Sequence, residues 1–129
     1  MPHFGMNKAI LIGTVDDTPR LHQTAERSRL TLRLKTVESY TDEAGTSHER
    51  RAWHDVVVWG RRAEALAGIL SRGRRVAIEG RIVNDHWDGS DGRRRYRTEI
   101  HAHDLVLLDS RGEGSTTALS PPSTQRDAA

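Results

Sequence analysis

The chain has 129 residues, a length typical of a single domain, and its formal net charge of +2 permits a polyanionic partner without requiring one. It contains no cysteine, which excludes disulfides and thiolate zinc sites. No apolar run approaches the ~18 residues of a membrane-spanning helix, and the N-terminus lacks a signal-peptide apolar region, so we expect a cytoplasmic protein.

The first third of the chain is expected to hold a leader, two strands and the loop between them. Residues 1–5 form a flexible leader, and the mostly apolar segment 7–15 reads as a strand. Gly13 within it marks a bulge or a close backbone approach. Residues 16–28 are polar and include a proline, which predicts a loop. Leucines alternate with polar residues in 29–37, as in a strand with one face in the core.

The middle of the chain is expected to contain a hairpin, a third strand, one helix and a fourth strand. Turn-forming residues at 42–46 predict the hairpin tip. Residues 52–60 are rich in β-branched and aromatic side chains, which favours a strand. Alanines and leucines follow the i, i+3, i+4, i+7 rule in 61–72, which predicts a helix that Gly73 ends. Alternation returns in residues 74–83.

The C-terminal part begins with a second hairpin, because residues 84–95 carry two Asp-Gly turn signals. Residues 96–108 form the last strand. Residues 109–129 are rich in Ser, Thr, Gly, Pro and Ala and cannot bury a core, so we expect a disordered tail. This order of elements, with three strands, one helix and then two strands, predicts an all-β protein. The order is that of the five-stranded OB-fold, a Greek-key barrel with its helix between strands 3 and 4.

Two tryptophans, Trp53 and Trp59, lie on the predicted third strand. Because side chains alternate along a strand, both indoles point to one face, whereas Val56 and Val58 point to the core. Eighteen of the 20 basic residues are arginine, which stacks on bases and binds phosphates. Flat rings in this setting indicate a surface on which nucleic-acid bases stack. The alternative is that both rings belong to the core.

Several segments of the chain resemble the bacterial single-stranded DNA-binding protein family, namely residues 6–13, 38–40, 53–60, 73–81 and 96–99. The resemblance covers residues 6–108, the expected domain. It implies a non-enzymatic protein without cofactors that binds and protects single-stranded DNA, without strong sequence preference, during replication, recombination and repair. It also implies a homotetramer associated with the nucleoid. The family's base-stacking positions match four aromatic residues: Tyr40, Trp53, Trp59 and Trp87.

The same resemblance places six basic residues near the DNA-binding groove: Lys8, Arg33, Lys35, Arg61, Arg72 and Arg81. Alternation puts Arg33, Lys35 and Arg81 on outward strand faces. Their role would be to neutralise phosphates, and DNA affinity would then fall as salt rises. The alternative for any one of them is an ordinary solvated charge.

Two features depart from the family pattern. The family commonly has basic residues just before the last tryptophan, whereas this chain has Asn84, Asp85 and His86. The hairpin would therefore either hold phosphate more weakly there or depend on residues 93–95 across the turn. Family members usually end in a short acidic tip with a terminal aromatic residue, which recruits replication and repair enzymes. This chain ends in residues 124–129 without that tip, so we do not expect those enzymes to dock through the tail. Either the protein is a specialised paralogue or phage-type version, or its partners bind elsewhere.

Other functions have less support in the sequence. The alternative function is an OB-fold accessory protein of the primosome type, with weak single-stranded DNA or RNA binding. His48, Glu49 and His54 differ in spacing from a zinc-binding HExxH motif. His101 and His103 share a strand face but have no evident third ligand. We expect neither a metal site nor a catalytic site.

Overall fold

The computed structural model describes residues 3–109. The predicted tail therefore lies outside the described residues from position 110 onward. Residues 3–5 of the predicted leader lie in no strand or helix. No helix in the described range is long and apolar enough to cross a membrane. The elements in chain order are β1 (Ala9–Val15), β2 (Arg20–Gln23), β3 (Ser28–Thr41), β4 (Ser47–Trp59), α1 (Arg61–Ala67), β5 (Arg75–Asp88) and β6 (Arg94–Leu107).

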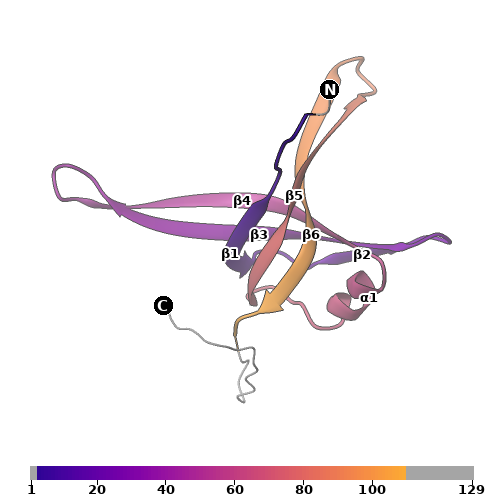
Figure 1. Ribbon diagram of the computed structural model, residues 1–129, viewed down its shortest axis with the longest axis horizontal. Coiled ribbons are helices and arrows are strands. Elements are labelled where there is room, and N and C mark those ends of the chain that lie inside the picture. The colour runs from indigo at the N-terminus through magenta and orange to yellow at the C-terminus, as the bar shows by residue number, and fades with distance from the viewer. Residues whose placement is uncertain (1–2, 110–129) are drawn as a thin grey trace.

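Five of the strands close a barrel (Figure 1). The strand order is β1-β5-β6-β4-β3-β2, and a further pairing of β1 with β3 joins the two sides. That pairing uses Thr14 opposite Lys35 and Val15 opposite Leu34. The pair β4–β6 is parallel, and the remaining pairs are antiparallel. The predicted OB-fold is therefore confirmed, with α1 between the third and fourth strands of the barrel.

The core forms from one face of each barrel strand. Leu30 pairs with Val58 and Leu32 with Val56 across β3 and β4, and all four side chains are buried. Burying each such side chain stabilises the fold by roughly 1.5–3 kcal/mol. The same cluster contains residues of β1, α1, the turn after α1, β5 and β6: Val15, Ala63, Leu66, Leu70, Val76, Ile78 and Ile100. The alternation predicted for residues 29–37 thus fills the inside of the barrel and leaves the other face free.

Gly13 is a point of close approach between the backbones of β1 and β3. A Cβ atom built at this position would collide with the carbonyl oxygen of Lys35. Only glycine lets the two backbones approach so closely. The predicted close backbone approach is therefore confirmed, and it lies directly beside the β1–β3 pairing that closes the barrel.

The helix is shorter than predicted. It ends at Ala67 rather than at residue 72, with Gly68 as the C-cap. Glycine costs roughly 1 kcal/mol relative to alanine inside a helix, which favours termination here. The amide of Leu70 still donates to the carbonyl of Leu66 at 2.8 Å, so the following turn keeps Leu70 in the core. The i, i+3, i+4, i+7 pattern predicted the buried residues correctly, but it extends beyond the end of the helix.

The predicted loop 16–28 contains a short strand. β2 pairs with the first residues of β3, from Arg20 opposite Thr31 to Gln23 opposite Ser28. All four β2 residues are exposed. An edge strand that buries neither face has no apolar alternation, so its sequence does not differ from that of a polar loop.

Both predicted hairpin tips are confirmed, and both hairpins extend beyond the barrel (Figure 1). The β3–β4 hairpin is exposed throughout residues 37–51, and the β5–β6 hairpin is almost entirely exposed between residues 84 and 98. These arms bury little apolar surface. Their backbone pairing nevertheless continues to the tips, so they place their side chains at fixed positions outside the barrel.

The last described residue fastens the end of β6 to the start of β5. Arg74 donates from Nε to Oδ1 of Asp109 at 2.8 Å, and the Arg75 amide donates to Oδ2 at 3.1 Å. Burial raises the pKa of Asp109, but these two hydrogen bonds and the Arg74 charge outweigh it, and the net pKa lies below the ordinary 3.8. The ionised carboxylate therefore stabilises the folded state.

We expect Asp109→Asn to lower the free energy of unfolding by about 1 kcal/mol at neutral pH. A carboxylate with a depressed folded-state pKa contributes its stability above the unfolded pKa and loses it as pH falls through the folded value. The difference between wild type and variant should therefore be constant above the ordinary pKa of 3.8 and shrink below it. Urea denaturation at pH 7 and at pH 3 measures this. An equal difference at both pH values would contradict the role of the ionised carboxylate.

Candidate nucleic-acid interface

The predicted Trp53/Trp59 face lies on the outside of the barrel beside basic residues of β3. Arg29 stands opposite Trp59, Arg33 opposite Asp55, and Lys35 opposite Trp53 in the β3–β4 register. Directly opposed residues of an antiparallel pair point to the same side of the sheet. Each tryptophan of β4 therefore has a cationic neighbour on the adjoining strand.

The same face continues over β6 and β5. Val57 of β4 is in register with His101 of β6, and His101 stands opposite Arg81 of β5. Further along this hairpin Trp87 stands opposite Arg95. Alternation on β5 puts Trp87 on the same side as Arg81. We call the side of the sheet that carries Trp53, Trp59 and Trp87 the outward face.

Trp53 is anchored by its edge and leaves its ring accessible. Its Nε1 donates to Oδ2 of Asp16 at 2.9 Å, and Lys35 Nζ lies 3.9 Å from Oδ1 of the same carboxylate. The residue remains 47 % exposed. This tryptophan is not part of the core, and its indole is oriented without being covered.

Trp59 is half-buried and is held by side chains from two directions. Its Nε1 donates to Nδ1 of His101 at 3.3 Å. The Arg27 guanidinium lies 3.9 Å from the ring centroid, and that of Arg29 lies 5.8 Å away. Cations at these distances are attracted to the face of the indole. The ring therefore belongs to a polar, cationic surface rather than to the apolar core.

Trp87 lies near the end of β5, on the projecting hairpin. It is 44 % exposed, and the Arg97 guanidinium lies 5.6 Å from its ring centroid. The three tryptophans thus share one arrangement. Each presents ring surface on the outward face, and each has a basic side chain near its ring.

Tyr40 is not brought together with the three tryptophans. It is five positions beyond Lys35 on β3, an odd number, so it points to the opposite side of the β3–β4 hairpin. Its ring stacks on His48 with centroids 5.2 Å apart and 23° between the planes. The Arg50 guanidinium lies 4.7 Å from the Tyr40 centroid. This aromatic cluster forms a separate exposed surface near the hairpin tip.

The carboxylate of Asp42 holds the His48 ring beside Tyr40. His48 Nε2 lies 2.7 Å from Oδ2 of Asp42, and the amides of Ala44 and Thr46 donate to Oδ1. The His48 hydrogen bond and then the Thr46 amide lower the pKa of Asp42 below its ordinary value. The ionised carboxylate thus links the turn to the ring stack.

Two recesses open on the outward face. The larger, of about 490 Å³, is bordered by β2, β3, β4 and β6 and contains four arginines and three carboxylates. The arginines are Arg20, Arg29, Arg33 and Arg97. The smaller, of about 410 Å³, lies against Trp59 and includes Arg27, Arg62, Arg81, His101 and His103. Both recesses combine guanidinium groups with apolar strand surface, a composition that suits a phosphate-bearing chain.

The six basic residues predicted from the sequence divide into two groups. Arg33 lines the larger recess, Arg81 the smaller one, and Lys35 stands beside Trp53. The others lie apart from both recesses. Lys8 pairs with Glu79 at 2.9 Å, Arg61 begins α1, and Arg72 lies in the connection that follows α1.

Sequence reasoning missed several arginines of the outward face. Arg29 has the same alternation as Arg33 and Lys35, so extending that pattern by two residues would have included it. Arg20 and Arg27 belong to the segment that was predicted as a loop. Their positions depend on β2, which the sequence does not reveal.

The histidines considered as metal ligands do not form a metal site. Within residues 3–109, no three His, Asp or Glu side chains converge closely enough to hold a metal ion. His48 is engaged by Asp42, and His54 lies 3.0 Å from the hydroxyl of Thr36. His101 is engaged by Trp59 and Glu99.

Comparison with known proteins places this geometry in a family. The chain is similar to Single-stranded DNA-binding protein 1 of Chlorobaculum tepidum, with 36 % identity over 95 % of this chain and 76 % of that protein. It is also similar to the single-stranded DNA-binding protein of Xanthomonas campestris pv. campestris, with 35 % identity over 85 % of this chain. It spans 64 % of that relative's length.

Solved structures show the same relationship. The Plasmodium falciparum SSB complex with ssDNA matches with a TM-score of 0.77 and 28 % identity, over 84 % of this chain and all of that one. Wild-type single-stranded DNA binding protein from Thermus aquaticus matches with a TM-score of 0.72 and 31 % identity, over 84 % of this chain and 52 % of that one. Residues 6–108 match the model of the single-strand binding protein family, which confirms the resemblance seen in the sequence. The chain therefore belongs to the single-strand binding protein family.

Proposed function

We propose that this protein binds single-stranded DNA without strong sequence preference and protects it during replication, recombination and repair. The observation that carries the proposal is the set of three tryptophans on one sheet face, each beside a basic side chain. We assign the binding to residues 6–108, the range that matches the family model. Its bacterial relatives lead us to infer that it acts in the cytoplasm on nucleoid DNA.

Stacking explains why binding would not depend on sequence. Every base has a flat π-face, and a base stacked on an aromatic side chain contributes roughly 1–3 kcal/mol. Trp53 and Trp87 offer nearly half of their surface to such contacts. The P. falciparum protein with the same fold is described in complex with ssDNA, which supports the same class of ligand here.

The position of Tyr40 constrains the path of the strand. We assign stacking to Tyr40, Trp53, Trp59 and Trp87, although Tyr40 faces the opposite side of the β3–β4 hairpin from Trp53. A single strand that reaches all four rings has to pass around this hairpin. The exposed arm between residues 37 and 51 leaves room for that course.

Basic side chains would follow the phosphates along this path. We assign Arg33, Lys35 and Arg81 to phosphate contacts on the outward face, joined by Arg20, Arg29 and Arg97 in the larger recess. Lys8, Arg61 and Arg72 would contact phosphates where the strand leaves that face. The Lys8–Glu79 ion pair is exposed, and the Lys35–Asp16 pair is half-buried with its charged atoms 3.9 Å apart, so only a modest free energy opposes their exchange for phosphate.

Binding rather than catalysis is the activity that this surface supports. Members of the family bind DNA and are not enzymes, and we infer the same of this chain. The alternative of a primosome-type accessory protein has no support among the relatives described above, which are named as single-stranded DNA-binding proteins.

The edge of β1 is the surface through which we expect this protein to form homotetramers. β1 pairs with β3 only at Thr14 and Val15, so within the described chain one edge of residues 9–13 has no partner strand. Ile10 and Ile12 are exposed on this segment. An unpaired edge with apolar side chains favours pairing with a second copy.

Poly(dT) should quench the intrinsic fluorescence of this protein at low salt, because stacked bases quench indoles. Sodium chloride should reverse the quenching as it competes with phosphate contacts. The logarithm of the affinity should fall linearly with that of the salt concentration, by about 0.7 per phosphate contact for a single strand. A fluorescence titration measures both effects. Absence of quenching at low salt would contradict the proposed function.

Trp53→Ala should weaken oligo(dT) binding by about 1–3 kcal/mol while the protein remains folded. The ring is exposed and lies outside the core, so its removal leaves the packing intact. Tyr96→Ala is the matched control. Tyr96 is 73 % exposed and stands opposite His86, on the other side of the hairpin from Trp87. Equal losses in the two variants, or unfolding of Trp53→Ala, would argue against a stacking role.

Light scattering should give a mass near four times the 14.5 kDa of one chain. Ile10→Glu should reduce that mass, because a charge on the free edge opposes strand pairing. Ile69→Glu, which replaces an exposed isoleucine near the end of α1, serves as the control and should leave the mass unchanged. A monomeric wild type would contradict the proposed assembly.

A further inference from the structure

A buried carboxylate lies within the cationic surface described above. Glu99 of β6 is 4 % exposed, and within residues 3–109 the only other buried polar side chain is Ser28. Burying a carboxylate is costly unless charges and hydrogen bonds compensate it. An acidic group beside a site for a polyanion also repels the ligand. Because the Glu99 carboxylate carries both costs, we looked for a favourable contribution of this side chain to the site.

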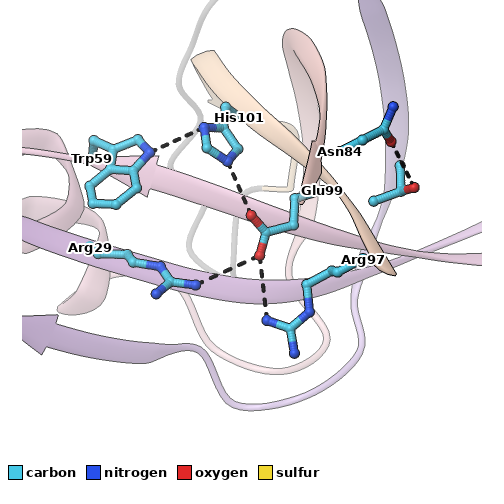
Figure 2. A network of polar contacts seen from close by, with 7 residues as sticks. Arg29, Trp59, Asn84, Arg97, Glu99 and His101 are labelled. Carbon is cyan, nitrogen blue, oxygen red and sulfur yellow. Dashed lines mark hydrogen bonds and ion pairs between the residues drawn. The ribbon is translucent and has the colours of Figure 1, made fainter. Parts of the chain in front are cut away.

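Glu99 is surrounded by side chains of the outward face (Figure 2). Its Oε2 lies 3.6 Å from Arg29 on β3 and 3.6 Å from Arg97 on β6. Its Oε1 lies 3.1 Å from Nε2 of His101. The Nε of Arg29 is buried and has no hydrogen-bond partner among the described residues, so Glu99 supplies the charged contact of this guanidinium, which also lies 5.8 Å from the centroid of the Trp59 ring.

His101 extends the network to Trp59. An indole N–H is only a donor, so Nδ1 of His101 has to accept the 3.3 Å hydrogen bond from Trp59. In a neutral imidazole the proton then lies on Nε2, which donates to Glu99. The two bonds run in one direction, from Trp59 through His101 to the carboxylate (Figure 2).

The groups that meet at Glu99 are those of the proposed DNA interface. Arg29 and Arg97 line the larger recess, and Arg97 also lies 5.6 Å from the ring of Trp87. Trp59 borders the smaller recess. Arginine and tryptophan side chains that are ordered before binding lose less entropy when the ligand arrives.

We propose that Glu99 is a positioning residue for DNA binding: it holds Arg29 and Arg97 at the groove and, through His101, orients the indole of Trp59. The proposal rests on the function proposed above. It assigns a favourable role to a negative charge within a surface that binds a polyanion. Charge repulsion alone would instead make Glu99 unfavourable for DNA binding, so the two explanations predict opposite effects on affinity.

Three variants separate these explanations. Glu99→Gln removes the charge and keeps the side-chain length, whereas Glu99→Asp keeps the charge and withdraws it from its partners. Asp55→Asn is the matched control: Asp55 is an exposed carboxylate that lines the same recess and stands opposite Arg33. Oligo(dT) affinity is measured for each at one fixed salt concentration, because the salt sets the electrostatic contribution.

Positioning predicts that both Glu99 variants bind oligo(dT) more weakly, by about tenfold for Glu99→Gln, because the ion pairs with Arg29 and Arg97 and the charge on the acceptor of the His101 hydrogen bond are lost. Asp55→Asn should instead bind about two- to threefold more tightly, since it removes an exposed charge that repels phosphate. A Glu99→Gln protein that binds as well as or better than wild type overturns the proposal. So does a Glu99→Asp protein with wild-type affinity. A wild type that does not bind oligo(dT) refutes the proposed function itself.

The free protein supplies a second readout. The indole N–H resonance of Trp59, identified by its loss in Trp59→Phe, should shift in Glu99→Gln and in His101→Leu, whereas that of Trp53, which lies outside the network, should not. Circular dichroism confirms that each variant is folded. If Glu99→Gln does not fold, Glu99→Asp and His101→Leu decide by the same affinity criterion. An unmoved Trp59 resonance in folded His101→Leu overturns the link through His101.

Discussion

Closure of the barrel determines which side chains of this protein can meet a ligand. Once β1 pairs with both β5 and β3, every barrel strand has one face inside and one outside. Side chains alternate strictly along a strand, so the residues between core leucines and valines are forced outward. On β3 and β4 those intervening positions include two arginines, a lysine and two tryptophans, beside Thr31, Asp55 and the buried Val57. The interface is thus a direct consequence of the core, and Gly13 contributes to it by permitting the close β1–β3 approach.

Positive and negative side chains nearly balance in the larger recess of the outward face. Its larger recess places four arginines against three carboxylates, in keeping with a chain whose net charge is only +2. Long-range attraction of DNA is correspondingly modest. Affinity then depends on where the arginines and rings are held, which short-range contacts such as those of Asp16 and Glu99 decide.

The sequence predicted the parts of this arrangement that local patterns encode. Period-two alternation sufficed to put Trp53 and Trp59 on one face and the leucines of β3 in the core. The resemblance supplied Trp87 and Tyr40, but not the side on which Tyr40 lies, because that depends on β3 continuing to Thr41 beyond the predicted strand 29–37. The Glu99 network joins residues 29, 59, 97 and 101. Its members meet only after three strands have assembled, so no local pattern contains it.

The aromatic rings of the interface are partly covered by cationic and imidazole side chains. Arg27 lies over Trp59, and the ring of Tyr40 stacks on His48 and has Arg50 beside it. A bare aromatic surface favours nonspecific association, and these side chains reduce that surface. Under the proposed function, a base that stacks on such a ring would displace an arginine, which would then be free to contact the adjoining phosphate. This replacement of an arginine by a base would lower the net free energy gained from stacking, but it would couple each stacked base to a phosphate contact. Ring and guanidinium then act as one unit that recognises a nucleotide by its base plane and its charge, the two features that all nucleotides share.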